Sequence, residues 1–228
     1  IGAVDEVVEI ELVNYFIKGN IELTKVDKDY PDNRLTGAEF EVYADTNGDG
    51  KLDSGDKLLG TMTEIDDGVY QMKELRYGKY LVREKTAPTG FVLDENVYSV
   101  SIEENGKTYI VENEAGVGFV NAAQKGSLKI VKTSSDGKIE GFSFRVTGTD
   151  GYDQTFKTDK NGEIFIEGLR IGEYTVSEVS DSVSAGYILP ADKQATVKVG
   201  ATTIVEMHNE LRDTPKTGDD FNLALWVS

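Results

Sequence analysis

Cysteine is absent from the 228 residues of this chain, and histidine occurs only once, at His208. Without cysteine no disulfide can stabilise the fold, and neither thiol nucleophiles nor clusters of imidazole ligands are available. His208 precedes Asn209 and falls on the opposite face of an expected strand, which favours a surface residue over a catalytic one. We therefore expect no enzyme, apart from a single reaction of the chain with itself.

Positive charge and helical periodicity are also scarce. With 24 Lys and Arg against 41 Asp and Glu, the net charge of −17 argues against binding to nucleic acid or to an anionic membrane. Segments rich in Val, Ile and Thr alternate instead with turn sequences such as Asp67-Gly68 and Asn161-Gly162. This alternation predicts an all-β chain built of antiparallel β-sandwich domains.

An internal repeat divides the chain. Residues 13–25 align without a gap on residues 120–132, an offset of 120 − 13 = 107 residues. A second match joins residues 78–84 to residues 172–178. Because the offset is about one domain length, the repeat predicts two tandem domains.

The repeat also predicts where the domains begin and end. The first domain is expected at residues 19–123 and the second at residues 124–211. Residues 1–18 are then either the closing strand of a domain further upstream or an extra N-terminal strand of the first domain. Residues 212–228 follow the last domain and are treated separately below.

In each predicted domain, three polar side chains extend rows of apolar residues. Side chains two apart on a strand share a face, so Lys25 lies on the same face as Ile21 and Leu23. The same count places five other polar residues on apolar rows: Glu84 and Asn121 in the first domain, and Lys132, Glu178 and Asn209 in the second. Lys and Glu are rarely buried unless they are paired, so their recurrence in both domains requires a chemical explanation.

Burial supplies such an explanation, because it lowers the pKa of a lysine and raises that of a glutamate. A neutral amine is a nucleophile, and a protonated carboxyl can polarise a carboxamide and move protons. The sequence therefore predicts one isopeptide bond per domain, formed with loss of ammonia. The predicted pairs are Lys25 with Asn121, assisted by Glu84, and Lys132 with Asn209, assisted by Glu178. The alternative is an ordinary ion pair, in which each lysine extends to water from a strand end.

Two segments around these residues carry a family pattern: residues 19–27, GNIELTKVD, and residues 80–91, YLVREKTAPTGF. They resemble the first strand and the E-box of collagen-adhesin B-type domains, also called SpaA-like pilin domains, of Gram-positive surface proteins. The resemblance implies Ig-like or prealbumin-like β-sandwiches in tandem, with an isopeptide bond between the first-strand Lys and the last-strand Asn. The second domain departs from the pattern, because residues 179–187 after Glu178 contain no proline and Thr-Ser follows Lys132.

A twelve-residue segment of the first domain, residues 45–56, has the oxygen-ligand spacing of a calcium loop. Its candidate ligands are Asp45, Asn47, Asp49, Asp53 and Asp56 through their side chains and Lys51 through its backbone carbonyl. The segment is similar to the calcium loops of staphylococcal-type B repeats, which implies calcium as a cofactor. The alternative is a solvated acidic turn, since Asn-Gly-Asp-Gly is common turn chemistry.

The last seventeen residues, 212–228, contain the sequence Thr214-Pro215-Lys216-Thr217-Gly218, followed by two acidic residues and a short apolar stretch. This sequence resembles the LPXTG sorting signal, with Thr214 in place of the leucine, ahead of the start of a truncated membrane anchor. The resemblance implies a sortase as partner, which would cleave after Thr217 and join it to peptidoglycan or to a pilin lysine.

Together these features predict an extracellular, cell-wall-anchored stalk or pilin subunit of a Gram-positive bacterium. The sequence Tyr30-Pro31-Asp32 lacks the lysine that a shaft pilin uses for polymerisation, which favours a tip, basal or singly anchored protein. The alternative function is an adhesin that binds a host or matrix ligand directly through its loops.

Overall fold

The structure, a computed structural model, describes residue 11 and residues 13–213. The chain divides into two compact units, with the boundary between Ala123 and Gln124. Apart from a single 3-10 turn at Thr149–Gly151, the regular elements of the described residues are all strands. The prediction of an all-β chain of tandem sandwiches is thus confirmed. No helix within residues 13–213 has the length and apolar character needed to span a membrane.

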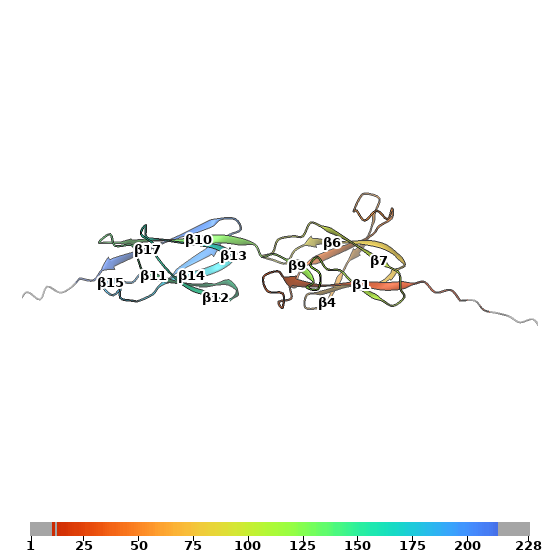
Figure 1. The fold of residues 1–228 in the computed structure, drawn as a ribbon, viewed down its shortest axis with the longest axis horizontal. Coiled ribbons are helices and arrows are strands. Elements are labelled where there is room, and N and C mark those ends of the chain that lie inside the picture. Colours follow the sequence, from red (N-terminus) through yellow and green to blue (C-terminus); the bar gives the residue numbers. More distant parts are fainter. Residues whose placement is uncertain (1–10, 12, 214–228) are drawn as a thin grey trace, which may run out of the picture. The chain divides into compact units, whose positions relative to one another are not determined.

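Unit 1 consists of two sheets packed face to face (Figure 1). One sheet has the order β4-β5-β1-β8, with β9 also paired to β1, and contains β1 (Lys18–Asp27), β4 (Thr63–Asp66), β5 (Val69–Arg76), β8 (Thr108–Ile110) and β9 (Phe119–Asn121). The other sheet has the order β3-β2-β6-β7 and contains β2 (Glu39–Ala44), β3 (Lys57–Thr61), β6 (Gly78–Thr86) and β7 (Val97–Ile102).

The core of unit 1 follows from the alternation of side chains along these strands. On β1, the apolar residues Ile21 and Leu23 are fully buried between the sheets, whereas Glu22 and Thr24 between them are only partly buried. Aromatic rings from both sheets meet in this interior, where the ring centroid of Phe40 is 4.9 Å from that of Phe119. Each such buried side chain contributes about 1.5–3 kcal/mol through loss of apolar surface to water.

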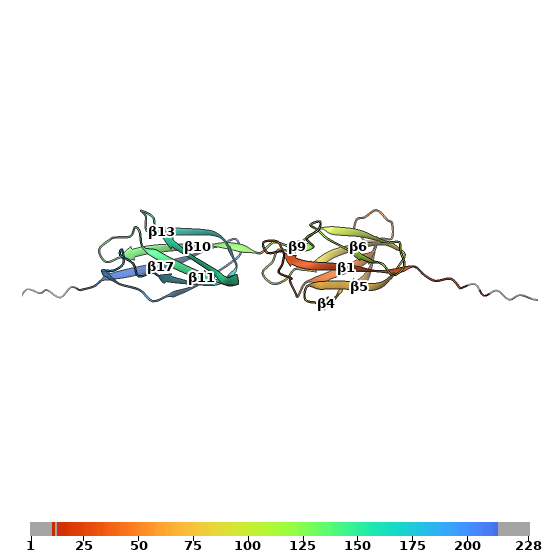
Figure 2. The same cartoon turned by 60° about the horizontal axis from the view of Figure 1, so that its bottom comes forward.

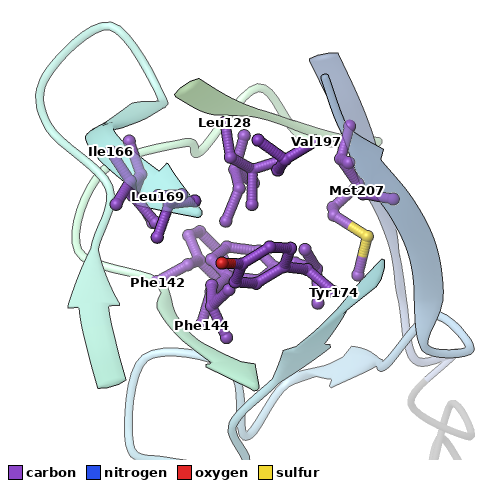
Figure 3. Close-up of a cluster of buried hydrophobic side chains, with 14 of the residues drawn as sticks. Leu128, Phe142, Phe144, Ile166, Leu169, Tyr174, Val197 and Met207 are labelled. Atoms are coloured by element: carbon purple, nitrogen blue, oxygen red, sulfur yellow. The ribbon is translucent and has the colours of Figure 1, made fainter. Parts of the chain in front are cut away.

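Unit 2 repeats this plan with its own core. One sheet has the order β13-β10-β17-β15 and contains β10 (Lys125–Ser134), β13 (Glu163–Arg170), β15 (Tyr187–Ile188) and β17 (Thr202–Leu211). The other has the order β12-β11-β14-β16 and contains β11 (Ser143–Gly148), β12 (Tyr152–Lys157), β14 (Gly172–Glu178) and β16 (Lys193–Val197). Figure 3 shows the side chains of both sheets meeting in the interior, with Leu128 and Met207 on one side and Phe144 and Tyr174 on the other.

The first and last strands of each unit run parallel, which differs from the purely antiparallel sandwich that the sequence predicts. In unit 1, β1 pairs in parallel with β8 and β9, and in unit 2, β10 pairs in parallel with β17 (Figure 2). The strand that precedes β8 in unit 1 is β7, and the strand that precedes β17 in unit 2 is β16; both belong to the opposite sheet. The chain therefore crosses from one sheet to the other before its closing strand pairs with the first strand. The closing strand then runs in the same direction as the first strand.

A close backbone approach explains why each unit begins with Lys-Gly. A Cβ atom on Gly126 would lie 2.2 Å from the carbonyl oxygen of Lys198, and one on Gly19 would lie 2.8 Å from that of Lys107. The pairing of each first strand also shifts register just after this glycine. The repeated glycine is therefore required by the contact between the two chain segments, not by turn geometry.

Residues 13–17 precede β1 and are exposed, without strand geometry. The backbone carbonyl of Ile17 accepts a hydrogen bond from the amide of Tyr77 at 2.9 Å, and the guanidinium of Arg76 lies 4.3 Å from the ring centroid of Phe16. Residues 1–10 and 12 lie outside the described residues, so the origin of the segment at residues 1–18 stays a prediction.

Candidate functional site

Three strands bring the predicted residues of unit 1 together. Lys25 lies on β1, Asn121 lies on the neighbouring β9, and Glu84 reaches them from β6 in the opposite sheet. The parallel register pairs Lys25 with Phe119, so Asn121 follows two residues later on the same face of β9. All three side chains are buried, and Lys25 is 0% exposed.

The carboxylate of Glu84 is the centre of this cluster. The Nδ2 of Asn121 donates to Glu84 Oε1 at 2.8 Å and to Oε2 at 2.9 Å. The backbone amide of Asp94 also donates to Oε2, at 2.8 Å. The amine of Lys25 donates to the carbonyl of Phe119 at 3.0 Å and lies 5.6 Å from the centroid of its ring. The amine thus sits beside the strand that carries Asn121.

Burial shifts both titratable groups of this cluster toward their neutral forms. Loss of solvation lowers the pKa of Lys25 to about 8, although the negative charges of Glu84, Asp94 and Asp27 oppose the shift. Loss of solvation also raises the pKa of Glu84, against the hydrogen bonds from the Asp94 amide and Asn121. The neutral amine and the protonated carboxyl are therefore more populated at neutral pH here than they are in water.

Unit 2 contains the same arrangement. Lys132 lies on β10, Asn209 on β17 and Glu178 on β14 of the opposite sheet. The parallel register pairs Lys132 with Met207, so Asn209 again follows two residues after the residue opposite the lysine. Glu178 pairs with Phe144 on its neighbouring strand, as Glu84 does with Phe40 in unit 1. The two clusters thus occupy equivalent positions in register.

The contacts in unit 2 correspond in part, because the carboxylate accepts fewer hydrogen bonds and the lysine amine donates to its own strand instead of the closing strand. The Nδ2 of Asn209 donates to Glu178 Oε1 at 2.7 Å. The amine of Lys132 donates to the carbonyl of Thr133 and lies 4.3 Å from the ring centroid of Phe142. Loss of solvation lowers the pKa of Lys132 and raises that of Glu178. Neither lysine extends to water, since Lys25 is 0% and Lys132 is 1% exposed.

Hydrogen bonding in both clusters is incomplete. Among the described residues, the buried side-chain nitrogen and oxygen atoms without a hydrogen-bond partner are Gln71 Oε1, Asn121 Oδ1, Glu178 Oε2 and Asn209 Oδ1. Three of these four atoms belong to the two clusters. An unpartnered buried polar atom costs about 1–3 kcal/mol of stability. The side-chain oxygen of each asparagine can therefore accept a hydrogen bond without losing an existing one.

The predicted calcium loop is the connection between β2 and β3, and it projects from the sandwich (Figure 1). The corresponding connection in unit 2 spans only residues 149–151. The carboxylate of Asp45 accepts hydrogen bonds from the amides of Gly48 at 2.7 Å and Gly50 at 3.1 Å. The carboxylate of Asp56 accepts from the amides of Thr46 at 3.0 Å and Asp53 at 2.9 Å. The side chains thus close the loop on itself.

The other predicted ligands make similar local contacts. Asn47 Nδ2 donates to Asp53 Oδ2 at 3.1 Å, and Asp49 Oδ1 accepts from the amide of Lys51 at 2.9 Å. Within residues 13–213, no group of three or more His, Cys, Asp or Glu side chains is placed to hold a metal ion. The donor set, all oxygen, fits the chemistry of calcium, but its carboxylates contact backbone amides and do not converge.

Two residues near Glu84 were not predicted as site residues. Asp94 follows β6 in a loop, and Asn113 lies in the loop between β8 and β9, where its side chain contacts both Asp94 and Val120. Neither occupies a position in the internal repeat, so the comparison of the two halves of the sequence gave no signal for them. His208 is exposed on β17, as predicted, and residues 214–218 of the predicted sorting signal lie outside the described residues.

Comparison with known proteins places the chain in a family. The model of the SpaA prealbumin-like fold domain matches residues 19–115 and, a second time, residues 126–211. Comparison with curated protein sequences found no match.

Solved structures share the fold. The Bacillus anthracis TIE protein is 26% identical with a TM-score of 0.64, and the match covers 86% of this chain and 34% of that one. This chain thus spans about one third of the length of that relative. A C-terminal fragment of the pilus adhesin SpaC from Lactobacillus rhamnosus GG is 14% identical with a TM-score of 0.50, over 88% of this chain and 99% of that one. With two matches that cover most of its length, the chain belongs to the SpaA prealbumin-like fold domain family.

Proposed function

We propose that the chain is an extracellular stalk or pilin-type surface protein of a Gram-positive bacterium, in which each unit is closed by an intramolecular Lys–Asn isopeptide bond. One observation carries the proposal: both units bury a Lys, a Glu and an Asn at equivalent register positions, with the Glu carboxylate against the Asn carboxamide. The match to the SpaA prealbumin-like fold domain family supports a pilin-type surface protein.

The proposed reaction begins with the neutral amine of Lys25 or Lys132. Its nitrogen attacks the side-chain carbonyl carbon of Asn121 or Asn209. The protonated Glu84 or Glu178 donates to the carboxamide oxygen, once the carboxamide has turned that oxygen toward the carboxyl in place of its nitrogen. The tetrahedral intermediate then loses its original nitrogen as ammonia, after the carboxyl has carried a proton from the lysine nitrogen to it. One N–C bond forms and one breaks, so no other reactant is needed. Each glutamate acts only once, and the reaction is favoured because the fold holds the reacting groups close together.

The bonds would close long loops in a chain that has no disulfide. The bond in unit 1 spans 121 − 25 = 96 residues, and the bond in unit 2 spans 209 − 132 = 77 residues. By the loop-entropy estimate used for disulfides, loops of this length add about 4–5 kcal/mol of stability. This stabilisation would take the role that disulfides have in other small extracellular domains.

The proposal includes covalent anchoring through residues 214–218. A sortase would cleave between Thr217 and Gly218 and transfer the carboxyl group of Thr217 to peptidoglycan or to a pilin lysine. The resemblance to the sorting signal supports this step, together with its place directly after the second domain.

The proposal also includes a calcium ion in the loop at residues 45–56. Six residues would hold it: Asp45, Asn47, Asp49, Asp53 and Asp56 through side-chain oxygens, and Lys51 through its backbone carbonyl. The oxygen-only donor set supports this assignment. Binding requires the carboxylates to exchange their bonds to backbone amides for the ion. Calcium would then stiffen this loop.

The mass of the purified chain tests the two bonds. Each bond removes one ammonia, so the full chain should be about 34 Da lighter than its sequence mass, at about 17 Da per bond. Glu84→Ala should abolish the mass loss of unit 1 only, and Glu178→Ala that of unit 2 only. Intact mass spectrometry with peptide mapping measures both, and a wild-type mass equal to the sequence mass would refute the proposal.

The pH dependence of stability tests the neutral amine. In an Asn121→Ala chain no amide can form, and Lys25, with a pKa of about 8 when folded and 10.5 when unfolded, remains free. Above pH 8 the unfolded state binds more protons at this residue, so the free energy of unfolding of unit 1 should rise with pH, by at most about 1.4 kcal/mol per pH unit.

The useful window for this measurement is pH 8–10. Tyr70 and Tyr98, whose pKa values burial raises to about 12, work in the opposite direction at higher pH. Urea denaturation followed by circular dichroism at fixed pH values measures the slope. The matched control is Lys25→Met in the same Asn121→Ala chain, which should lack this increase. Equal slopes in the two chains would show that Lys25 is not neutralised by burial.

Calcium titration tests the loop. Isothermal titration calorimetry of the full chain with calcium chloride should show one site, and Asp49→Ala should weaken it by about tenfold or more, because it removes one charged oxygen ligand. Asp159→Ala changes an acidic turn of unit 2 and should leave binding unchanged. If the wild-type chain binds no calcium, or if both variants behave alike, the loop is a solvated turn.

Sortase cleavage tests the anchoring signal. Incubation of the chain with a sortase and a glycine peptide should give a product in which the peptide follows Thr217, which mass spectrometry identifies. Thr217→Ala should abolish the product, whereas Thr214→Leu should increase it with a sortase that prefers leucine at the first position. Cleavage at another peptide bond, or none with several sortase classes, would disprove this part of the proposal.

A further inference from the structure

The last strand is continuous in unit 2 and interrupted in unit 1. In unit 2, β17 pairs with β10 over eight consecutive residues, which end at Asn209. In unit 1 the corresponding strand is divided into β8 and β9, with three pairs each to β1, and residues 111–118 form a loop between them. Asn121 therefore lies on a three-residue strand, whose hydrogen bonds to β1 fix it less firmly.

The side chain of Asn113 compensates for this interruption. Its Oδ1 accepts a hydrogen bond from the amide of Val120 at 2.6 Å, and its Nδ2 donates to the carbonyl of the same residue at 2.9 Å. These two bonds imitate the pairing of a neighbouring strand. Because Val120 directly precedes Asn121, they fix the position from which the Asn121 side chain turns inward.

Asp94 connects this contact to the glutamate. Its Oδ2 accepts from Asn113 Nδ2 at 2.8 Å and from the hydroxyl of Tyr98 at 2.6 Å, and its Oδ1 accepts from the amide of Asn96 at 2.9 Å. The backbone amide of Asp94 donates to Glu84 Oε2. One residue thus holds the carboxyl through its backbone and the strand of Asn121 through its side chain.

Unit 2 contains no such connection to its cluster among the described residues. Glu178 Oε2, the atom that corresponds to the one held by Asp94 in unit 1, has no hydrogen-bond partner. Asp181 lies in the loop after β14 and forms hydrogen bonds with Ser143 and Ser184. Neither of these residues belongs to β17. Continuous pairing of β17 makes a separate contact unnecessary.

The network of unit 1 also borders solvent. A surface cavity of about 360 Å³ is lined by Asp94, Asn113 and Asn121, among other residues. The cavity gives ammonia released at Asn121 a short route to water. Asp94 and Asn113 therefore hold the strand of Asn121 and also separate the cluster from solvent.

We propose that Asp94 and Asn113 are positioning residues for the crosslink of unit 1, where they replace the continuous strand that positions Asn209 in unit 2. This inference rests on the proposed isopeptide reaction. The two residues touch neither reacting atom. They act by holding Glu84 and Asn121 at the fixed separation that the reaction requires.

An exchange of the two side chains tests the inference. Asn113→Asp places a second carboxylate against that of Asp94, which should push the contact apart and slow the crosslink of unit 1 by about 10- to 100-fold. Adding Asp94→Asn restores a donor and an acceptor across the same contact in reversed order. The double variant should recover a large part of the rate, although the carbonyl of Val120 loses its donor.

Cell-free synthesis followed over time by peptide mapping measures the crosslinked fraction of each unit in the same molecule. Unit 2 is the internal control and should crosslink at the wild-type rate in every variant. Asn96→Ala is the matched control, because it removes a side-chain bond to Asp94 without touching the strand of Asn121. Circular dichroism melting of each variant in a Glu84→Gln chain, which cannot crosslink unit 1, reports whether unit 1 folds.

The outcomes separate this inference from the reaction on which it rests. If unit 1 of the wild-type chain never loses ammonia, the proposed function fails. If it does, but folded Asn113→Asp crosslinks at the wild-type rate, only the positioning role fails. An unrescued double variant that is folded would also overturn it. Should Asn113→Asp not fold, Asp94→Ala takes its place, and an unchanged rate in that folded variant would count against the inference.

Discussion

A lysine amine buried between the first and last strands is the feature on which the architecture of both units depends. An isolated ammonium in such a place costs several kcal/mol, and a single carboxylate partner seldom offsets this cost in a dry interior. Here the carboxamide on the closing strand is hydrogen-bonded to the carboxyl of the opposite sheet, and in unit 1 the lysine amine donates to the closing strand at Phe119. Burial of these groups in their charged forms is therefore unfavourable. Their hydrogen bonds nevertheless connect the opposite sheet to the strand that closes the unit.

The two units show which parts of this arrangement are constrained. They differ in the length of the β2–β3 connection, in the division of the last strand, and in the sequence after the glutamate. In both units, however, the lysine pairs with the residue that lies two positions before the asparagine. The glutamate also pairs with a buried phenylalanine in both units. The departures after Glu178 do not move its side chain, because β14 positions it before the chain leaves the sheet.

Alternation along single strands was enough to predict the fold class and the inward direction of Lys25 and Lys132, because it depends only on local backbone geometry. The parallel pairing of first and last strands could not be predicted in this way, since alternation is the same for either direction of a neighbour. Asp94 and Asn113 were missed for a related reason. Their contacts depend on how two loops close, and no counterpart in the other unit marked them in the sequence.

Parallel pairing also decides what a covalent bond at these positions would do under tension. In unit 1 the chain enters at the start of β1 and leaves at the end of β9, at the opposite end of the ladder. Pulling on these points loads the ladder in shear, and a bond from Lys25 to Asn121 would carry the force past residues 26–120. The long loop at residues 45–56 and the interrupted last strand would then lie outside the path of force. With the proposed bond in place, unit 1 could therefore accommodate an insertion and a broken strand without mechanical weakness, provided that Asn121 were held in place until the bond formed.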